Sequence, residues 1–248
     1  MTVDHTSDTE PEPARRRPGR GWTVAAAAIV ALIALAAVVV ILATRGGDKA
    51  PPTGAPPATP HSVVESPSAA PLPAQDQSVP DSPPPGISWA LFQGVALPSS
   101  SSAGPTRVTG PVYAGYAQTP VGALLAAAQI SYRYLISPDD DWHQVVNQQV
   151  VPDSGREVYV QKRAKVTTAS AAHGTYGQLA GFRFVTYAPD TAVIQYVTRF
   201  SNGNLQVATD TVHWFAGDWK LQLQPDGSET PTVQSVANLA GFVPWSGL

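Results

Sequence analysis

An uncharged run from Thr23 to Thr44 constrains this chain more than any other feature of its sequence. The run contains neither Gly nor Pro, and Ala, Val, Leu and Ile fill almost all of it. A helix of about 22 residues is roughly 33 Å long, close to the ~30 Å hydrocarbon core of a lipid bilayer. We therefore predict a transmembrane helix over residues 23–44 that inserts the protein into the bilayer.

Arginine is concentrated on the N-terminal side of this run. Four arginines lie within residues 15–20, whereas only Arg45 and Lys49 follow the run closely. An excess of Arg and Lys marks the cytoplasmic side of a membrane segment. Residues 1–22 are therefore predicted to form a disordered cytoplasmic head, with the rest of the chain extracytoplasmic. A cleaved signal peptide is the alternative, but its apolar core is usually shorter and ends at a small-x-small site that is missing here.

Residues 45–88 have the composition of a linker. The chain contains 25 Pro, and 12 of them lie between the apolar run and about residue 90, interspersed with Ala and Ser. Pro removes a backbone donor and disfavours both helix and sheet, so this segment is predicted to be an extended tether.

Residues 89–248 are predicted to form one extracytoplasmic α+β domain. Residues 87–98 read as an extended arm. Thr119-Pro120 supplies an N-cap and a first-turn Pro for a helix through Leu135. Further helix starts are predicted at residues 137–140 and 154–157, although the segment after the second also fits a strand.

Alternating apolar and polar residues follow from about residue 180. The segments 180–188, 191–200, 204–215 and 219–224 are predicted to be consecutive antiparallel strands, with a hairpin turn at 201–204. Thr230-Pro231 repeats the cap-and-Pro pattern and predicts a short helix ending near Gly241. The order of elements indicates helices packed on one face of a curved antiparallel sheet.

Composition excludes several classes of function. The chain has no Cys, so it has no disulfide, no thiolate metal site and no lipid-modified cysteine. A net charge of −3 gives no support for nucleic-acid binding, which calls for a basic face. Nucleophile-elbow, zinc-protease, phosphate-loop and dinucleotide-loop motifs are all missing, so we expect no cofactor.

The residues closest to an acid/base site are Asp210, His213 and Asp218. Asp210 and His213 are three apart on one predicted strand, so their side chains point to opposite faces. Asp218 falls in a tight turn, where Gly-Asp serves backbone geometry. We therefore assign no catalytic residue.

Two charged clusters have simpler explanations than a binding site. His143 lies beside the acids of residues 139–141, but acids at a helix start are favoured by the helix dipole, so no metal site is assigned. The basic residues Arg156, Lys162, Arg163 and Lys165 are interpreted as a solvated helix face, with contact to an anionic lipid or envelope polymer as the alternative.

Aromatic residues stand at both ends of the predicted domain, namely Trp89, Phe92, Phe242 and Trp245. We expect the two ends to pack together as part of the core. An aromatic docking surface is the alternative.

The segment VHWFAGDWKLQL carries a resemblance to a known fold. The pattern Trp-x-x-Gly-(Asp/Glu)-Trp-(Arg/Lys)-Leu, here Trp214 to Leu221, is similar to a hairpin frequent in the nuclear-transport-factor-2-like superfamily. The resemblance implies a cone-shaped domain with a concave sheet. In that cone the side chains expected to line a pocket are Phe182, Phe184, Tyr196 and Trp214.

The layout of head, span, tether and outer domain resembles actinobacterial single-pass membrane proteins of undefined function. It is also similar to the scaffold subunits of conjugation and type IV secretion machines, and to proteins associated with lipid-import (Mce) operons. We therefore expect a plasma-membrane protein that binds envelope partners without catalysis. A lipid or small-molecule binder is the alternative, and a small-molecule enzyme is a further one.

Overall fold

The computed structural model describes residues 75–138, 140–166 and 176–247, all within one unit of the chain, residues 36–248. The predicted head, the apolar run of residues 23–44 and most of the predicted tether lie outside these described residues. Among the described residues, no helix has both the length and the apolar character needed to cross a bilayer.

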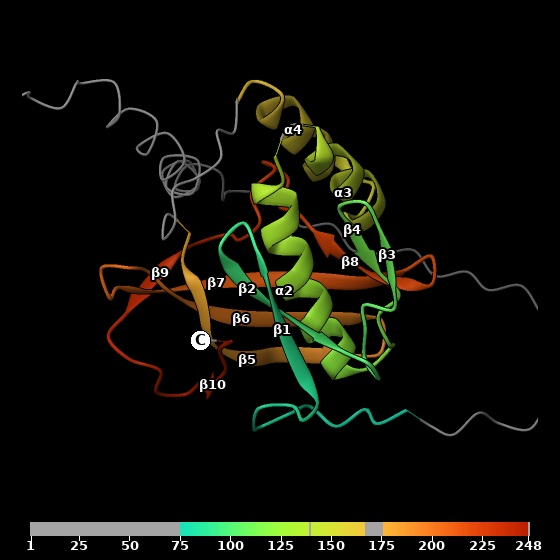
Figure 1. The fold of residues 1–248 in the computed structure, drawn as a ribbon. Coiled ribbons are helices and arrows are strands. Elements are labelled where there is room, and N and C mark those ends of the chain that lie inside the picture. Colours follow the sequence, from blue (N-terminus) through green and yellow to red (C-terminus); the bar gives the residue numbers. More distant parts are fainter. Residues whose placement is uncertain (1–74, 139, 167–175, 248) are drawn as a thin grey trace, which may run out of the picture. The chain divides into compact units, whose positions relative to one another are not determined.

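An antiparallel meander forms the centre of the fold (Figure 1). Its strands are β5 (Gln178–Ala188), β6 (Thr191–Arg199), β7 (Leu205–Phe215) and β8 (Asp218–Gln222). The predicted alternation is confirmed, because Phe182, Ile194 and Leu221 are fully buried while Arg183 and Val185 are exposed.

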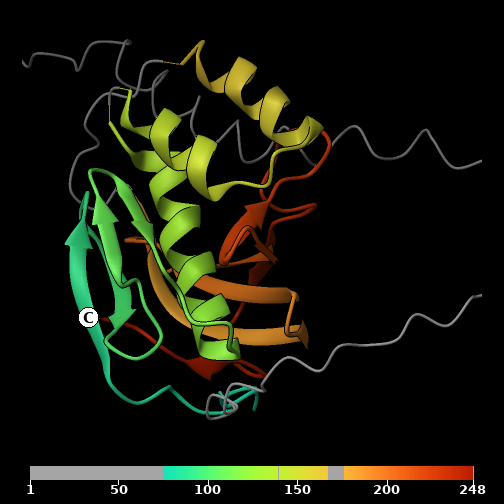
Figure 2. The same ribbon diagram turned by 90° about the vertical axis from the view of Figure 1, so that its right-hand side faces the viewer.

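Helices cover one side of this sheet, as Figure 2 shows. They are α2 (Pro120–Ile136), α3 (Asp141–Gln149) and α4 (Ser154–Arg163). The central helix α2 is buried along nearly its whole length, with Leu124 and Ile130 inside the main core. The predicted α+β class, with three helices packed against antiparallel sheets, is therefore confirmed for the described residues.

The starts of α2 and α4 match the sequence prediction to within a residue. The predicted cap at Ser137 is wrong, because Ser137 is the C-cap of α2, and α3 begins at Asp141 after Asp140, which makes no side-chain cap hydrogen bond. Thr119 caps α2 by accepting a hydrogen bond from the Gly122 amide at 3.0 Å. The N-cap of α4 is Asp153 rather than Ser154, and its carboxylate accepts from the Arg156 amide at 3.0 Å. Because residues 154–163 are helical, the strand alternative for this segment is wrong.

The predicted helix between Thr230 and Gly241 is wrong. Thr230 is buried, and its hydroxyl accepts from the Thr209 amide and donates to the Thr232 carbonyl, both at 3.0 Å. A hydroxyl used in this way is not available to cap a helix. The segment instead lies extended along the sheet.

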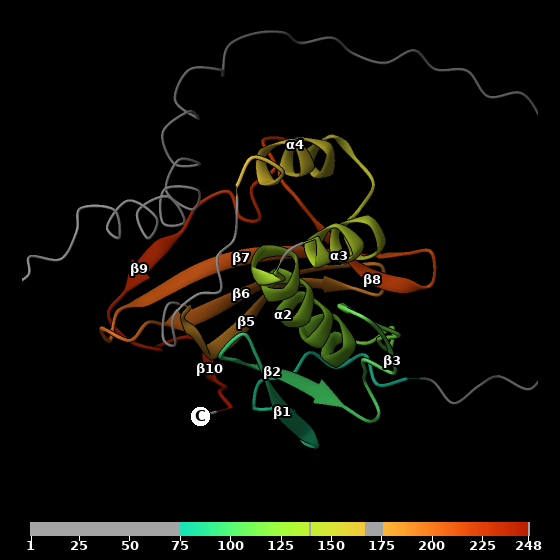
Figure 3. The same cartoon turned by 45° about the horizontal axis from the view of Figure 1, so that its top comes forward.

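Two short strands replace that helix. β9 (Gln234–Val236) pairs with the start of β7, and β10 (Val243–Pro244) pairs with Phe182 and Gly181 of β5. β8 pairs with the other end of β7, so β8 and β9 lie at opposite ends of the same strand (Figure 3). The C-terminal segment thus crosses from the β7 side of the sheet to its β5 edge.

The predicted N-terminal arm is a β-hairpin of β1 (Ile87–Phe92) and β2 (Val95–Ser100). Its two-residue turn has positive φ at both Gln93 (49°) and Gly94 (82°), the geometry of a type I′ turn. Val95 and Leu97 of β2 pack against the end of α2 in a separate apolar cluster. A second hairpin joins β3 (Arg107–Thr109) and β4 (Val112–Ala114).

Gln77 hydrogen-bonds the described end of the predicted tether to this domain. The Gln77 amide donates to the Gln118 carbonyl at 2.8 Å, and the Tyr187 hydroxyl donates to Gln77 Oε1 at 2.5 Å. Gln77 therefore joins the chain before β1 to both the sheet and the turn that precedes α2.

Candidate functional site

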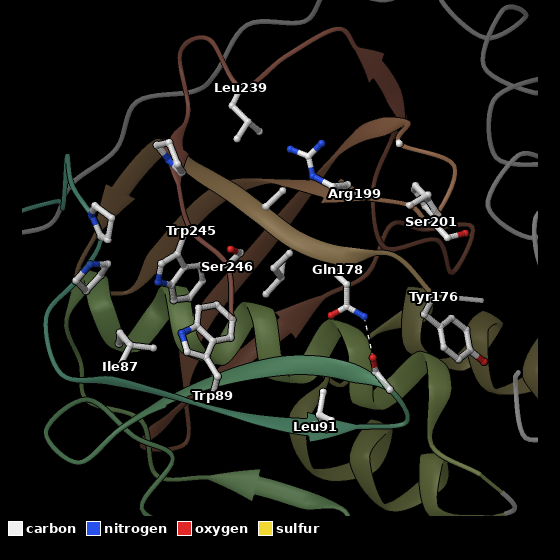
Figure 4. A pocket seen from close by; sticks show the side chains of 18 of the residues that line it. Ile87, Trp89, Leu91, Tyr176, Gln178, Arg199, Ser201, Leu239, Trp245 and Ser246 are labelled. Atoms are coloured by element: carbon white, nitrogen blue, oxygen red, sulfur yellow. Dashed lines mark hydrogen bonds between the residues drawn. The ribbon is translucent and has the colours of Figure 1, made fainter. Parts of the chain in front are cut away.

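A groove of about 1060 Å³ lies between the β1–β2 hairpin and the β5 edge of the sheet (Figure 4). Its lining comes from residues 83–94, 176–180, 199–203 and 239–246, and we call it the hairpin groove. The walls are therefore built by segments from both ends of the domain. A concave site with mostly apolar walls and few polar groups is typical of ligand-binding pockets.

One glutamine fixes the hairpin beside the sheet. Gln178, at the start of β5, accepts from the Ala96 amide at 3.0 Å and donates to the Gly94 carbonyl at 2.7 Å. The side chain satisfies two backbone groups of the hairpin turn region at once. The width of the groove at this end is thus set by a side chain rather than by strand pairing.

The other end is closed by tryptophans from the two ends of the domain. Trp89 of β1 packs edge to face against Trp245, which also contacts Phe182 with 5.3 Å between ring centroids. The Trp245 amide donates to the Ala180 carbonyl at 3.0 Å, so this residue extends the β10 contact with β5. The expectation that the two ends of the domain pack together is confirmed for Trp89 and Trp245.

The remaining two terminal aromatics lie elsewhere. Phe92 stacks on the guanidinium of Arg133 at 4.2 Å, and Phe242 stacks on Arg183 at 4.7 Å. Neither lines the hairpin groove.

Charge is sparse along the groove. Among the described residues that line the groove, Arg199, at the end of β6, is the one charged side chain, and none is Asp or Glu. Leu91 of β1 lines the groove and is 71% exposed, the largest exposure among the large apolar side chains of the described residues. The groove therefore combines an accessible apolar wall with a single positive charge.

The four residues expected to line a cone-shaped pocket pack in or against the main core. Phe182 and Tyr196 are buried there, and the Tyr196 hydroxyl donates to the Leu124 carbonyl at 2.5 Å. Phe184 and Trp214 are partly buried and pack against the same core. None of the four lines the hairpin groove.

Asp218 has a structural role beyond its own turn. Its carboxylate accepts from the Gly115 amide at 2.6 Å and the Tyr116 amide at 3.0 Å, and Arg107 lies 3.6 Å away. These contacts tie the β7–β8 turn to the chain that leaves β4. His213 faces away from Asp210, with Nδ1 3.1 Å from the Thr191 hydroxyl.

Asp210 points into the core, where a second acid lies near it. Ser131 of α2 donates to Asp210 Oδ2 at 2.8 Å, and the Tyr134 hydroxyl donates to Glu229 at 3.4 Å. Asp210 Oδ1 and Glu229 Oε1 are both buried, and neither accepts a hydrogen bond from any described residue.

Burial governs the protonation of these two acids. It raises the pKa of Glu229 from 4.5 to about 7, against the opposing hydrogen bonds from Ser131 and Tyr134. Burial also raises the pKa of Asp210 well above its ordinary value, and repulsion from Glu229 raises it further. Two like charges this deeply buried are strongly disfavoured, so the pair retains at least one proton near neutral pH. Neither acid lines the hairpin groove.

The other charged candidates have packing roles. His143 stacks on Trp142 with ring centroids 3.6 Å apart, and the described residues contain no group of three metal-binding side chains. Arg163 is buried against Trp142 and donates to the Val166 carbonyl, so the basic cluster is not a uniformly solvated face. Lys162 donates to the Asp226 carbonyl at 2.7 Å.

Sequence reasoning missed Arg199, Leu91 and Glu229. Arg199 and Leu91 follow the strand pattern and give no local signal of a groove. Glu229 lies in the loop after β8, and only the fold brings it beside Asp210.

Comparison with known proteins places the chain by family. No curated protein and no solved structure matches it. One family model, described as a domain of unknown function (DUF8175), matches residues 49–244, which is most of the chain. The match begins within the Pro-rich segment and ends at β10, so it includes all helices and strands of the described residues. The chain therefore belongs to the DUF8175 family.

Proposed function

We propose that this protein is a membrane-anchored, non-catalytic binding protein of the cell envelope, whose outer domain binds its ligand in the hairpin groove. The apolar run of residues 23–44 supplies the anchor and the Pro-rich segment of residues 45–88 supplies the tether. In this proposal the outer domain is extracytoplasmic, because arginines precede the apolar run.

One observation carries the binding role, namely the groove with Leu91 exposed on its wall and no acid in its lining. The acids with unusual surroundings lie elsewhere. Asp218 accepts hydrogen bonds from backbone amides, and Asp210 and Glu229 each have a buried carboxylate oxygen. An acid/base reaction needs such groups within reach of a substrate, so binding without catalysis is the better account.

The order of elements, helices followed by an antiparallel meander ending in the Trp214–Leu221 hairpin, supports a nuclear-transport-factor-2-like domain. In scaffold subunits of that layout the partners are proteins of an envelope assembly, such as a conjugative transfer or export machine. A lipid or small-molecule ligand is the second candidate, and the apolar groove favours it.

Native mass spectrometry of the full chain, extracted in a mild nonionic detergent, tests the binding role. We expect a co-purifying ligand or partner that is lost in Leu91→Arg, because the new side chain fills the groove. Val108→Arg is the matched control, since Val108 is 58% exposed on β3 and outside the groove lining. A chain without any bound species, or one bound equally by both variants, would contradict the proposal.

Cell fractionation tests the anchor separately. The mature chain is expected in the membrane fraction with its N-terminal head intact. A product found free in the culture fluid and beginning near Gly46 would rule out the tether.

A further inference from the structure

The polar and apolar linings of the hairpin groove are separated in space. In Figure 4 the side chains of Ile87, Trp89 and Trp245 gather at one end, while Arg199 and Ser201 lie toward the other. Leu91 and Leu239 lie between them on opposite walls. A ligand that follows the groove thus meets an apolar surface along most of its length and a cation near one end.

Arg199 has no counter-ion within the described part of the chain. The ion pairs there are Arg107 with Asp218 and Arg156 with Glu157, and no hydrogen bond of the Arg199 guanidinium to a described residue is present. Gln178, which is opposite Arg199 in the β5–β6 register, is hydrogen-bonded to the hairpin. A guanidinium free on a groove wall is suited to a carboxylate or phosphate, which it binds through two parallel hydrogen bonds.

The apolar part of the groove is open to solvent in this structure. Leu91 is 71% exposed although its side chain lines the groove. Large apolar side chains exposed in a concavity mark a binding surface, because their burial by a ligand is favourable.

We propose that the hairpin groove binds an anionic acyl amphiphile, with its acyl chain along Leu91, Trp89 and Trp245 and its charged head at Arg199. This inference rests on the proposed binding function and adds the class of ligand. A cationic ligand would meet no acid among the described residues that line the groove. A protein segment would be recognised by the same apolar wall, but the single cation at one end favours a molecule with one anionic end.

Photo-crosslinking tests the proposal on the full chain in phosphatidylcholine nanodiscs. The probe is palmitate carrying a diazirine near the end of its chain, and the neutral control is the hexadecanol analogue with the same diazirine. Labelled peptides are mapped by mass spectrometry. We expect palmitate to label residues 87–92 and 239–246 at least fivefold more than the alcohol does.

Two pairs of variants separate the head from the tail. Arg199→Gln is expected to reduce palmitate labelling at least fivefold, whereas Lys165→Gln, which removes an exposed charge outside the groove, leaves it unchanged. Leu91→Ser is expected to reduce labelling by both probes, and Val108→Ser to reduce neither. A urea unfolding midpoint equal to that of the parent chain shows that each variant is folded.

Each remaining outcome overturns a defined part of the proposal. Equal labelling by acid and alcohol, unaffected by Arg199→Gln, would refute the anionic head and leave the groove as an apolar binding site. Displacement of palmitate by acetate at the same concentration would identify a site for free anions instead. Labelling of neither segment, together with a co-purifying protein in native mass spectrometry, would assign the groove to a protein partner and refute the amphiphile.

Discussion

The ring of Trp89 meets the ring of Trp245 edge to face, with 4.9 Å between their centroids and 60° between their planes. These residues belong to the first strand of the described domain and to the segment after its last strand. Gly247 lies so close that a Cβ there would fall 2.5 Å from Trp89 Cδ2. The contact between the two ends of the domain is therefore specific to these side chains.

We expect Trp89 and Trp245 to be energetically coupled. In a double-mutant cycle with Trp89→Leu and Trp245→Leu, the coupling free energy should be about 0.5–1.5 kcal/mol in favour of the pair, as for other edge-to-face aromatic contacts. Urea unfolding of the four proteins measures it. The control is a second cycle with Trp89→Leu and Phe215→Leu, because Phe215 lies at the β7–β8 turn. The coupling free energy of this pair should fall within about 0.5 kcal/mol of zero.

Asp218→Asn is expected to lower the free energy of unfolding by about 1.5–3 kcal/mol, since charge-assisted hydrogen bonds to two backbone amides are weakened. The Asn side chain has one acceptor oxygen, and its amide group cannot accept from the second N–H. Asp190→Asn removes the same charge from an exposed turn and should change stability by no more than about 0.5 kcal/mol. Equal urea midpoints for the two variants would contradict the bracing role of Asp218.

The buried pair of Asp210 and Glu229 predicts a stability that depends on pH. Between pH 4.5 and about 7, the folded protein keeps a proton on Glu229 that the unfolded chain has lost. Stability therefore falls as pH rises through this range, with a slope of up to about 1.4 kcal/mol per pH unit for one proton. For Glu229, both states are protonated well below pH 4.5, and its contribution is lost above about pH 7. Asp210, whose pKa burial also raises, adds a loss of the same sign as pH rises.

Glu229→Gln isolates this contribution. The variant keeps the shape of the side chain but does not titrate, so its stability should fall less steeply between pH 5 and 7 than that of the parent chain. Glu157→Gln, at an exposed position of α4, should retain the parental slope. Urea unfolding at a series of pH values measures both, and a parental slope in Glu229→Gln would refute the assignment.

Arg133 is buried between two aromatic rings, 4.2 Å from the centroid of Phe92 and 3.3 Å from that of Tyr113. Its Nε donates to Gln129 Oε1 at 2.8 Å. We expect Arg133→Lys to cost about 1–3 kcal/mol, because an ammonium group neither stacks as a plane nor donates with this geometry. Arg183→Lys is the control, since Arg183 stacks on Phe242 at the surface and should cost less than about 1 kcal/mol.

Local patterns were sufficient to predict the meander and the three helices. The alternating pattern places Phe182 and Ile194 on the buried face of the sheet. The Thr119-Pro120 cap depends only on residues within one helical turn. The C-terminal segment was mispredicted because Thr230 has the sequence context of a helix cap, whereas its partner Thr209 lies 21 residues earlier on β7. The Thr230 hydroxyl accepts a hydrogen bond from the distant Thr209 amide instead of capping a helix.

The candidate site was less predictable than the fold. The hairpin groove joins segments from opposite ends of the domain, and Gln178 bridges to Gly94 across 84 residues. The aromatic residues near both ends gave the only signal, through Trp89 and Trp245. Arg199 and Glu229 acquire their significance from neighbours that no short window of sequence contains.

The position of β10 also affects whether two copies of this protein can associate through the edges of their sheets. By pairing with Gly181 and Phe182, it interrupts the outer edge of β5, and irregular pairing with β6 on either side bends that strand. At the opposite edge, the Val151 amide donates to the Leu221 carbonyl of β8 at 2.8 Å. Within the described residues, neither border of the meander offers a long, flat row of vacant amides to a neighbouring copy, which protects the protein from polymerising by strand addition at high local concentration.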